Sequence, residues 1–187
     1  FTITTPIIVT LFADALDRRL RWPALAAAVL AVIGTIPVAR GAKDLSLTLA
    51  GILLVQLSNA AFGIGQVLYK RLRATVDLRD RDVFGLMYAG GLAVALSLVV
   101  TREVSWALSA PQLWTLLYLG VLASGLGFFL WNVGATRVSA GTLAVMNNAK
   151  VPLGVGVSLL FFGGQANLLN LSVSLAALGA AVWLARR

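Results

Sequence analysis

The sequence predicts an all-α protein, a polytopic bundle of transmembrane helices. Of its 187 residues, 59% are hydrophobic and only 12% are charged, whereas soluble domains carry about 25% charged residues. Lys150 is the only charge between Val138 and Ala185, a stretch long enough to cross a membrane twice. Continuous apolar runs of this kind exclude the alternating strands of a barrel, so only helices can satisfy the backbone in lipid.

Seven apolar segments separated by short charged connectors predict the individual helices. A transmembrane helix needs about 20 apolar residues. The first segment is shorter, so we expect the sequence to begin inside a helix, with earlier helices of the same chain missing from it. The expected helices are Phe1–Ala13, Pro23–Ala39, Leu47–Tyr69, Val83–Thr101, Gln112–Ala135, Ala140–Gly163 and Leu168–Ala185.

Lys and Arg are shared unevenly between the two sets of alternate connectors, which predicts the orientation. The positive-inside tendency places the richer set in the cytoplasm, and with it the C-terminus of a multi-pass inner (plasma) membrane protein. The richer set holds Arg18, Arg19, Arg21, Lys70, Arg71, Arg73, Arg79, Arg81, Arg137, Arg186 and Arg187, and the other set holds Arg40, Lys43 and Arg102. Because the basic charge lies in connectors between spans, we expect no nucleic-acid partner.

The first and sixth apolar segments resemble each other, which indicates an internal repeat. Each has a proline near its start, Pro6 or Pro152, and we expect a helix kink at both. Each is followed by a helix rich in Ala, Leu and Val with a late glycine, Gly34 or Gly179. Five helices separate corresponding positions, an odd number, so the two copies run in opposite directions. Inverted repeats of this kind are typical of secondary transporters.

Short motifs in both halves are similar to a known family. The string Phe129–Asn132, followed by Gly134-Ala135, Ala140–Thr142 and Pro152, resembles the second half of EamA-type transporters in the drug/metabolite transporter superfamily. Leu16–Trp22 is similar to the end of that family's first half.

The resemblance implies ten helices arranged as an inverted five-plus-five repeat. Residues 1–41 would be the last two helices of the first repeat, and residues 42–187 the five helices of the second. The sequence departs from the family pattern at two positions. Arg18 and Gly164 occupy positions where the family usually has a glutamate.

A polar stripe marks one face of Leu47–Tyr69. Gln56, Asn59, Gly63 and Gln66 recur at helical spacing. In lipid such a stripe must meet another helix or a polar cavity. Either it holds helices together through hydrogen bonds, or Gln56, Asn59 and Gln66 line a substrate cavity.

The sixth segment carries the strongest candidate site. Lys150 lies roughly 15–20 Å from either end of that helix at about 1.5 Å per residue, and a charge at such depth usually faces a bundle interior or a wet cavity. Asn147 shares its face, and Pro152 should displace the carbonyl of Asn148. We expect these groups to bind substrate or a coupling ion; the alternative is that Lys150 pairs with an acid on a missing helix.

Trp131 is a further candidate, in line with Ser124 and Phe128 on the fifth segment. It is either an aromatic anchor at the membrane surface or part of a gate or cavity wall that touches substrate.

These observations favour a secondary transporter or exporter of small metabolites, such as amino acids, amines or related compounds. Alternating access around a mid-membrane polar cavity would be the mechanism. The expected partners are a small-molecule substrate and the lipid bilayer, and a homodimer remains open. The alternatives are a non-transporting structural or assembly protein, or a sensor that holds retinal on Lys150. The sequence has no His or Cys and no paired carboxylates within a span, so we expect no enzyme, cofactor or metal site.

Overall fold

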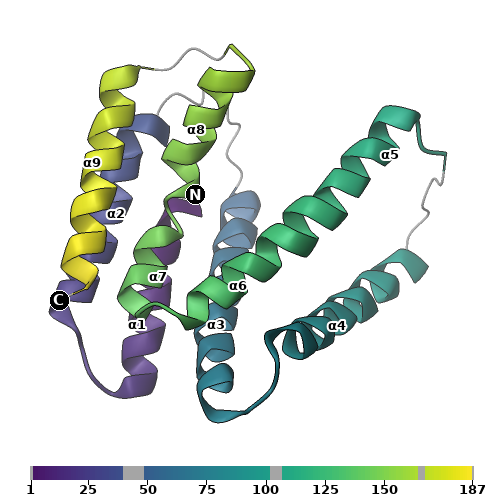
Figure 1. Ribbon diagram of the computed structural model, residues 1–187, viewed down its shortest axis with the longest axis horizontal. Helices are drawn as coiled ribbons and strands as arrows, with labels where there is room; N and C mark the ends of the chain where they lie inside the picture. Colours follow the sequence, from purple (N-terminus) through teal and green to yellow (C-terminus); the bar gives the residue numbers. More distant parts are fainter. Residues whose placement is uncertain (1, 40–48, 102–106, 164–166, 187) are drawn as a thin grey trace. The chain divides into compact units, whose positions relative to one another are not determined.

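Every regular element that the structure describes is a helix, which confirms the all-α prediction. The computed structural model describes residues 2–39, 49–101, 107–163 and 167–186. The elements are the 3-10 turn η1 (Thr2–Thr4), α1 (Thr5–Asp17), α2 (Trp22–Ala39), α3 (Leu49–Thr75), α4 (Asp80–Val100), α5 (Ala110–Leu117), the π-helical segment η2 (Tyr118–Gly127), α6 (Phe128–Thr136), α7 (Ala140–Met146), α8 (Lys150–Phe161) and α9 (Leu168–Ala185) (Figure 1). Arg40, Lys43, Arg102 and Gly164, and the predicted boundary between residues 41 and 42, lie outside the described residues.

Five helical segments among the described residues are long and apolar enough to cross a membrane, which confirms the polytopic transmembrane prediction. They are Leu49–Thr75, Asp80–Val100, Ala110–Thr136, Ala140–Phe161 and Leu168–Ala185. The apolar part of α2 is shorter, from Trp22 to Val38. Figure 1 shows α5 running into α6 as one continuous rod through η2.

The helix α3 is longer than the sequence predicts. It was expected to end at Tyr69 but continues to Thr75. Lys and Arg are good helix formers, and their charges near a helix C-terminus interact favourably with the helix dipole. The first basic residues of the connector therefore extend α3 instead of starting a loop.

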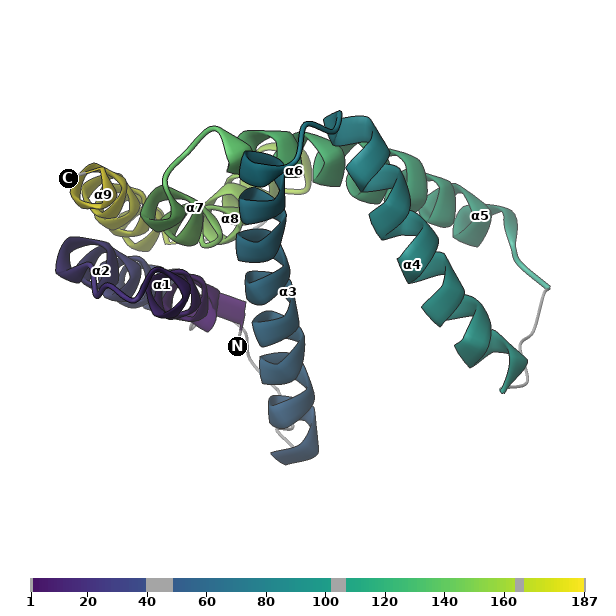
Figure 2. The same ribbon diagram turned by 90° about the horizontal axis from the view of Figure 1, so that it is seen from below.

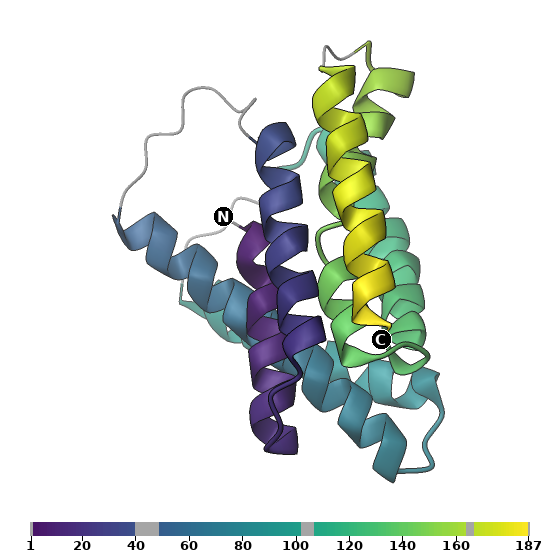
Figure 3. The same ribbon diagram turned by 90° about the vertical axis from the view of Figure 1, so that its left-hand side faces the viewer.

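One compact unit contains Phe1–Leu68 and Val138–Arg187. Within it α2 lies along α9, and α1 packs against α7 (Figures 1 and 3). Small side chains allow the close approach of α2 and α9: a side chain at Gly34 would collide with the Cβ atom of Ala177, and the Ser174 hydroxyl donates to the Gly34 carbonyl. The apolar core between these helices consists of Ala27, Ala31, Val145, Ala149, Leu178 and Ala181.

A second compact unit, Tyr69–Arg137, contains the end of α3, then α4, and the run α5–η2–α6 (Figure 2). The connector between α3 and α4 is fixed by Asp80 in the first turn of α4. Its Oδ1 atom accepts hydrogen bonds from the Tyr69 hydroxyl at 3.0 Å and from Arg73 Nε at 2.7 Å. A carboxylate at a helix N-terminus is also favoured by the helix dipole.

The close contact of α2 and α9 can be tested with one methyl group. We expect Gly34→Ala to destabilise the protein by about 1–3 kcal/mol, because the new Cβ overpacks against Ala177. Gly179→Ala is the matched control, since a Cβ there meets nothing within 4 Å. Thermal unfolding in detergent would measure both. Equal unfolding temperatures for the two variants would contradict this packing.

Candidate functional site

The sixth predicted segment is not one regular helix. It is divided into α7 and α8 by the turn at residues 147–149. The backbone hydrogen bonds tighten there to three-residue spacing: Asn148 N–H donates to Val145 at 3.0 Å, and Ala149 N–H to Met146 at 3.1 Å. An interruption of helical hydrogen bonding inside a membrane span is where transporters commonly form their substrate sites.

The two prolines of the predicted repeat lie at different places in their helices. Pro152 is the third residue of α8, and the Asn148 carbonyl four residues before it accepts from Val151 N–H at 3.1 Å. The Asn148 carbonyl is therefore not left without a donor. Pro6 lies in the first turn of α1. The 3-10 turn η1 runs directly into that first turn, and the kink expected at Pro6 stays a prediction.

Asn147 is joined to α3 by a reciprocal pair of amide hydrogen bonds. Gln66 Nε2 donates to Asn147 Oδ1 at 3.2 Å, and Asn147 Nδ2 donates to Gln66 Oε1 at 2.9 Å. Both side chains are buried. Asn147 Nδ2 also donates to the Leu143 carbonyl at 3.1 Å. The pair fixes the turn to α3 at a point where both amides are shielded from solvent.

The rest of the predicted polar stripe on α3 also makes helix contacts. Gln56 Oε1 accepts from the Thr4 hydroxyl and from Asn59 Nδ2, each at 3.0 Å. A Cβ at Gly63 would lie 3.1 Å from a methyl group of Val9, so α1 approaches α3 closely there. Gln56 and Gln66 therefore bond to η1 and to the turn at residues 147–149, while the bond from Asn59 to Gln56 stays within α3. A substrate-binding role for Gln56, Asn59 and Gln66 stays a prediction.

Asn148 crosslinks the turn to η1 and α2. Its side chain is fully buried, and its Nδ2 atom donates to the carbonyls of Ile3 at 2.9 Å and Ala31 at 3.2 Å. Thr35 Oγ1 lies 3.4 Å from the same nitrogen. Asn148 Oδ1 has no hydrogen-bond partner within the described part of the chain. A buried carbonyl oxygen of this kind normally has a partner, so it offers an acceptor at the turn.

Lys150 is not enclosed as the sequence predicts. Asn147 is buried, whereas the side chain of Lys150, the first residue of α8, is exposed. The reason lies in the neighbours of the two half-helices. Residues 141–145 of α7 are all buried, but Pro152 is the only buried residue of α8. Lys150 therefore lies at the boundary between α7, which is largely buried, and α8, which is largely exposed.

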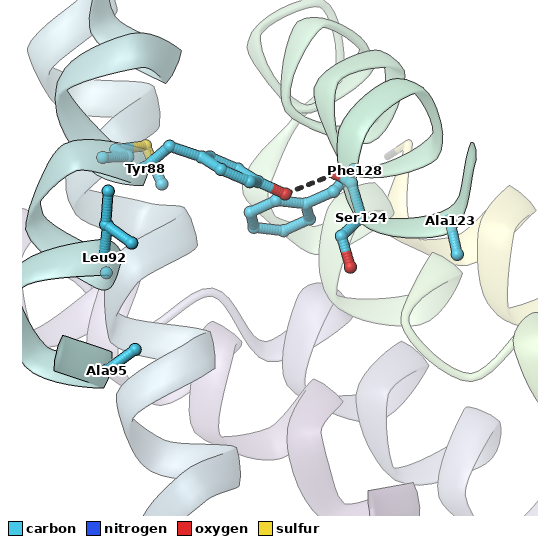
Figure 4. A pocket seen from close by; sticks show the side chains of 8 residues that line it. Tyr88, Leu92, Ala95, Ala123, Ser124 and Phe128 are labelled. Carbon is cyan, nitrogen blue, oxygen red and sulfur yellow. Dashed lines mark hydrogen bonds between the residues drawn. The ribbon is translucent and has the colours of Figure 1, made fainter. Parts of the chain in front are cut away.

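The second unit contains a groove of about 670 Å³ between α4 and η2. Figure 4 shows the Tyr88 side chain extending from α4 toward η2. Its hydroxyl donates a hydrogen bond to the Ser124 carbonyl at 2.6 Å, and the Phe128 ring lies beside the Tyr88 ring. The groove is lined by Met87, Tyr88, Gly91, Leu92, Ala95, Ala123, Ser124 and Phe128. The π-helical turns of η2 are wider than α-helical turns, and such segments are frequent at functional sites.

The sequence placed Ser124 and Phe128 in line with Trp131 but predicted a cavity wall only for Trp131, and it missed Tyr88. Nothing in the pattern of α4 distinguishes Tyr88 from its exposed apolar neighbours. Trp131 does not line the groove. It is half-buried, and its indole Nε1 has no hydrogen-bond partner among the residues that the structure describes, so it is not simply an exposed surface residue.

Comparison with known proteins gives one family and several relatives. The model of the EamA-like transporter family matches residues 49–186. The chain is 44% identical to a "Probable biotin transporter" of Pseudomonas aeruginosa, 40% identical to a "Biotin transporter" of Salmonella typhimurium, and 39% identical to a "Biotin transporter" of Escherichia coli. These alignments include 100% of this chain but only 66%, 63% and 63% of the relatives, so the chain spans less than two thirds of their length. No solved structure matches the chain.

The amide pair of Gln66 and Asn147 can be tested with a double-mutant cycle. We expect Gln66→Leu and Asn147→Leu each to destabilise the protein by about 1–2 kcal/mol, because each leaves a buried amide unpaired. The double variant should cost less than their sum by about 0.6–1.7 kcal/mol. Unfolding in detergent gives the free energies. A cycle of Asn147→Leu with Gln56→Leu is the control, and in it the two losses of unfolding free energy should add. If the losses also add in the cycle of Asn147→Leu with Gln66→Leu, the pairing is contradicted.

Proposed function

Because the chain belongs to the EamA-like transporter family, we propose that it is a secondary carrier for biotin or a closely similar small carboxylate. In coarser terms, the chain is a multi-pass membrane protein of a transporter family for small metabolites. The observation that supports the finer proposal is the interrupted segment α7–α8, with buried amides at the turn and an ammonium group directly after it.

The chemistry of the turn fits a carboxylated substrate. Lys150 has no hydrogen bond or ion pair within the described residues, and its ammonium group can pair with a carboxylate. An ammonium at mid-depth costs about 2.5–3.5 kcal/mol or more in lipid, and an anionic ligand offsets part of that cost. Biotin carries a carboxylate on a flexible chain and a cyclic urea. A urea N–H can donate to an amide oxygen, and Asn148 Oδ1 is the acceptor at the turn that has no partner among the described residues.

The sequence alone favoured amino acids, amines or related compounds as substrates. Lys150 separates these classes, because a cation repels a protonated amine and attracts a carboxylate. Amino acids therefore remain the competing substrates, and simple amines do not. In the proposal Lys150 contacts substrate, while Gln56, Asn59 and Gln66 hold α3 in place during the alternating-access cycle. Trp131 as a substrate contact and assembly as a homodimer remain predictions from the sequence.

Uptake of radiolabelled biotin by the full-length protein in proteoliposomes tests the proposal. We expect Lys150→Gln to reduce uptake by at least about tenfold, since loss of one partner from a charge pair costs about 2–5 kcal/mol. Lys150→Arg should retain part of the activity. Biotin methyl ester, which lacks the negative charge, should compete poorly. Arg81→Gln removes an exposed charge outside the site and serves as the control.

Two outcomes would contradict this assignment. Full biotin uptake by Lys150→Gln would remove Lys150 from the site. Uptake of leucine but not of biotin by the unaltered protein would assign the amino-acid alternative.

We also propose that the C-terminus lies in the cytoplasm, as the distribution of Lys and Arg favours. The sequence contains no cysteine, so a single introduced cysteine reports its own side. We expect a membrane-impermeant maleimide to label Arg186→Cys in inverted vesicles but not in spheroplasts. Ser109→Cys, at the start of α5, should be labelled in spheroplasts. The reverse pattern would overturn this orientation.

A further inference from the structure

A small crevice at the end of α1 joins an apolar floor to a strongly basic rim. Its volume is about 320 Å³, and all of its residues belong to the first compact unit. It is lined by Leu11, Asp14, Ala15, Arg18, Arg19 and Leu20. Leu11 and Leu20 are about half exposed, at 46% and 50%, so the floor is open to an apolar chain.

The backbone at the end of α1 holds the two arginines in place. Arg18 has φ 51°, a left-handed conformation that a residue other than glycine adopts at an energetic cost. Its N–H donates to the Ala15 carbonyl at 3.2 Å, and Arg19 N–H donates to the Asp14 carbonyl at 3.0 Å. Glycine or asparagine is the usual residue at such a helix end. Here an arginine occupies the position instead, and the helix end carries two guanidinium groups on consecutive residues.

The nearby acid does not neutralise these two charges. Asp14 is only 3% exposed, and both of its oxygens are used by Arg21: Oδ1 by the guanidinium Nε at 2.6 Å, and Oδ2 by the backbone N–H at 2.9 Å. Arg21 also pairs with Asp17 at 3.1 Å. Arg18 and Arg19 are exposed, and their guanidinium groups have no partner within the described ranges. The three arginines of this segment outnumber its two aspartates by one, so the rim is net positive and presents the two exposed guanidinium groups of Arg18 and Arg19.

We propose that this crevice binds an anionic phospholipid, with the phosphodiester between Arg18 and Arg19 and an acyl chain along Leu11 and Ala15. Guanidinium groups recognise phosphate oxygens by paired hydrogen bonds. The crevice lies at the junction of two apolar helices, where a membrane protein meets the headgroup layer. Basic pockets on the cytoplasmic side are favoured by the negative potential of that leaflet. A soluble phosphate would contact the two arginines but not the apolar residues below them. A lining with both arginine and leucine side chains therefore favours a lipid.

Lipid binding by the full-length protein in detergent tests this site and does not depend on the transported substrate. Native mass spectrometry and thermal unfolding would compare phosphatidylglycerol with phosphatidylcholine of the same acyl chains. We expect selective retention of phosphatidylglycerol and a higher unfolding temperature with it. Arg18→Gln/Arg19→Gln should weaken phosphatidylglycerol binding by about 30-fold, about fivefold for each charge. Arg79→Gln/Arg81→Gln, which removes two exposed charges of the second unit, should leave it within about twofold of the unaltered protein.

Four results would decide against a lipid site. Equal binding of the two lipids would overturn the proposal, because it would show no preference for the anionic headgroup. An equal loss in both double variants would also overturn it and would leave only a general attraction of basic connectors to anionic membranes. Inorganic phosphate that displaces phosphatidylglycerol at millimolar concentration would show an anion site without a lipid. Should the Arg18→Gln/Arg19→Gln variant not fold, the single variants Arg18→Gln and Arg19→Gln decide, each with an expected loss of about fivefold. A loss below twofold in both would count against the site.

Discussion

The constraint on which this structure depends is the interrupted hydrogen bonding at residues 147–149, inside a span that lipid would otherwise keep helical. Every backbone polar group in a membrane must find a partner within the protein. The turn meets this requirement by tightening its own hydrogen bonds and by burying two asparagine side chains against α3, η1 and α2. The interruption is thus stabilised by residues distant in sequence. It brings the end of α7 and the start of α8 together within one span.

The two half-helices have different surroundings. The α7 half is enclosed by α1, α2 and α9 through small and β-branched residues. The α8 half is largely uncovered in the described unit, and Lys150 begins it. The amide side chains of the turn bond within the fold, whereas the side chain of Lys150 is exposed.

Much of the fold could be predicted from the sequence, because hydrophobic length alone determines a membrane span. The last helix was predicted as Leu168–Ala185 and is observed with those bounds. The pairing of the polar stripe was predicted as one of two alternatives. The turn at residues 147–149 was not predicted as a division into two helices, since its partners Gln66, Ile3 and Ala31 come from distant segments. The exposure of Lys150 was also missed, because helical spacing places a residue on a face but does not say what covers that face.

Whether the start of α8 contacts the transported molecule can be decided by substrate protection at the turn. Lys150 stays in place and Val151 is changed to cysteine in the cysteine-free sequence, with Leu160→Cys on the same helix as the control. The rate of maleimide labelling is then measured with and without biotin. We predict that biotin at ten times its Kd slows labelling at residue 151 by about tenfold and leaves residue 160 unchanged. Labelling at residue 151 that biotin does not slow, in a protein that still transports biotin, would contradict the proposed contact.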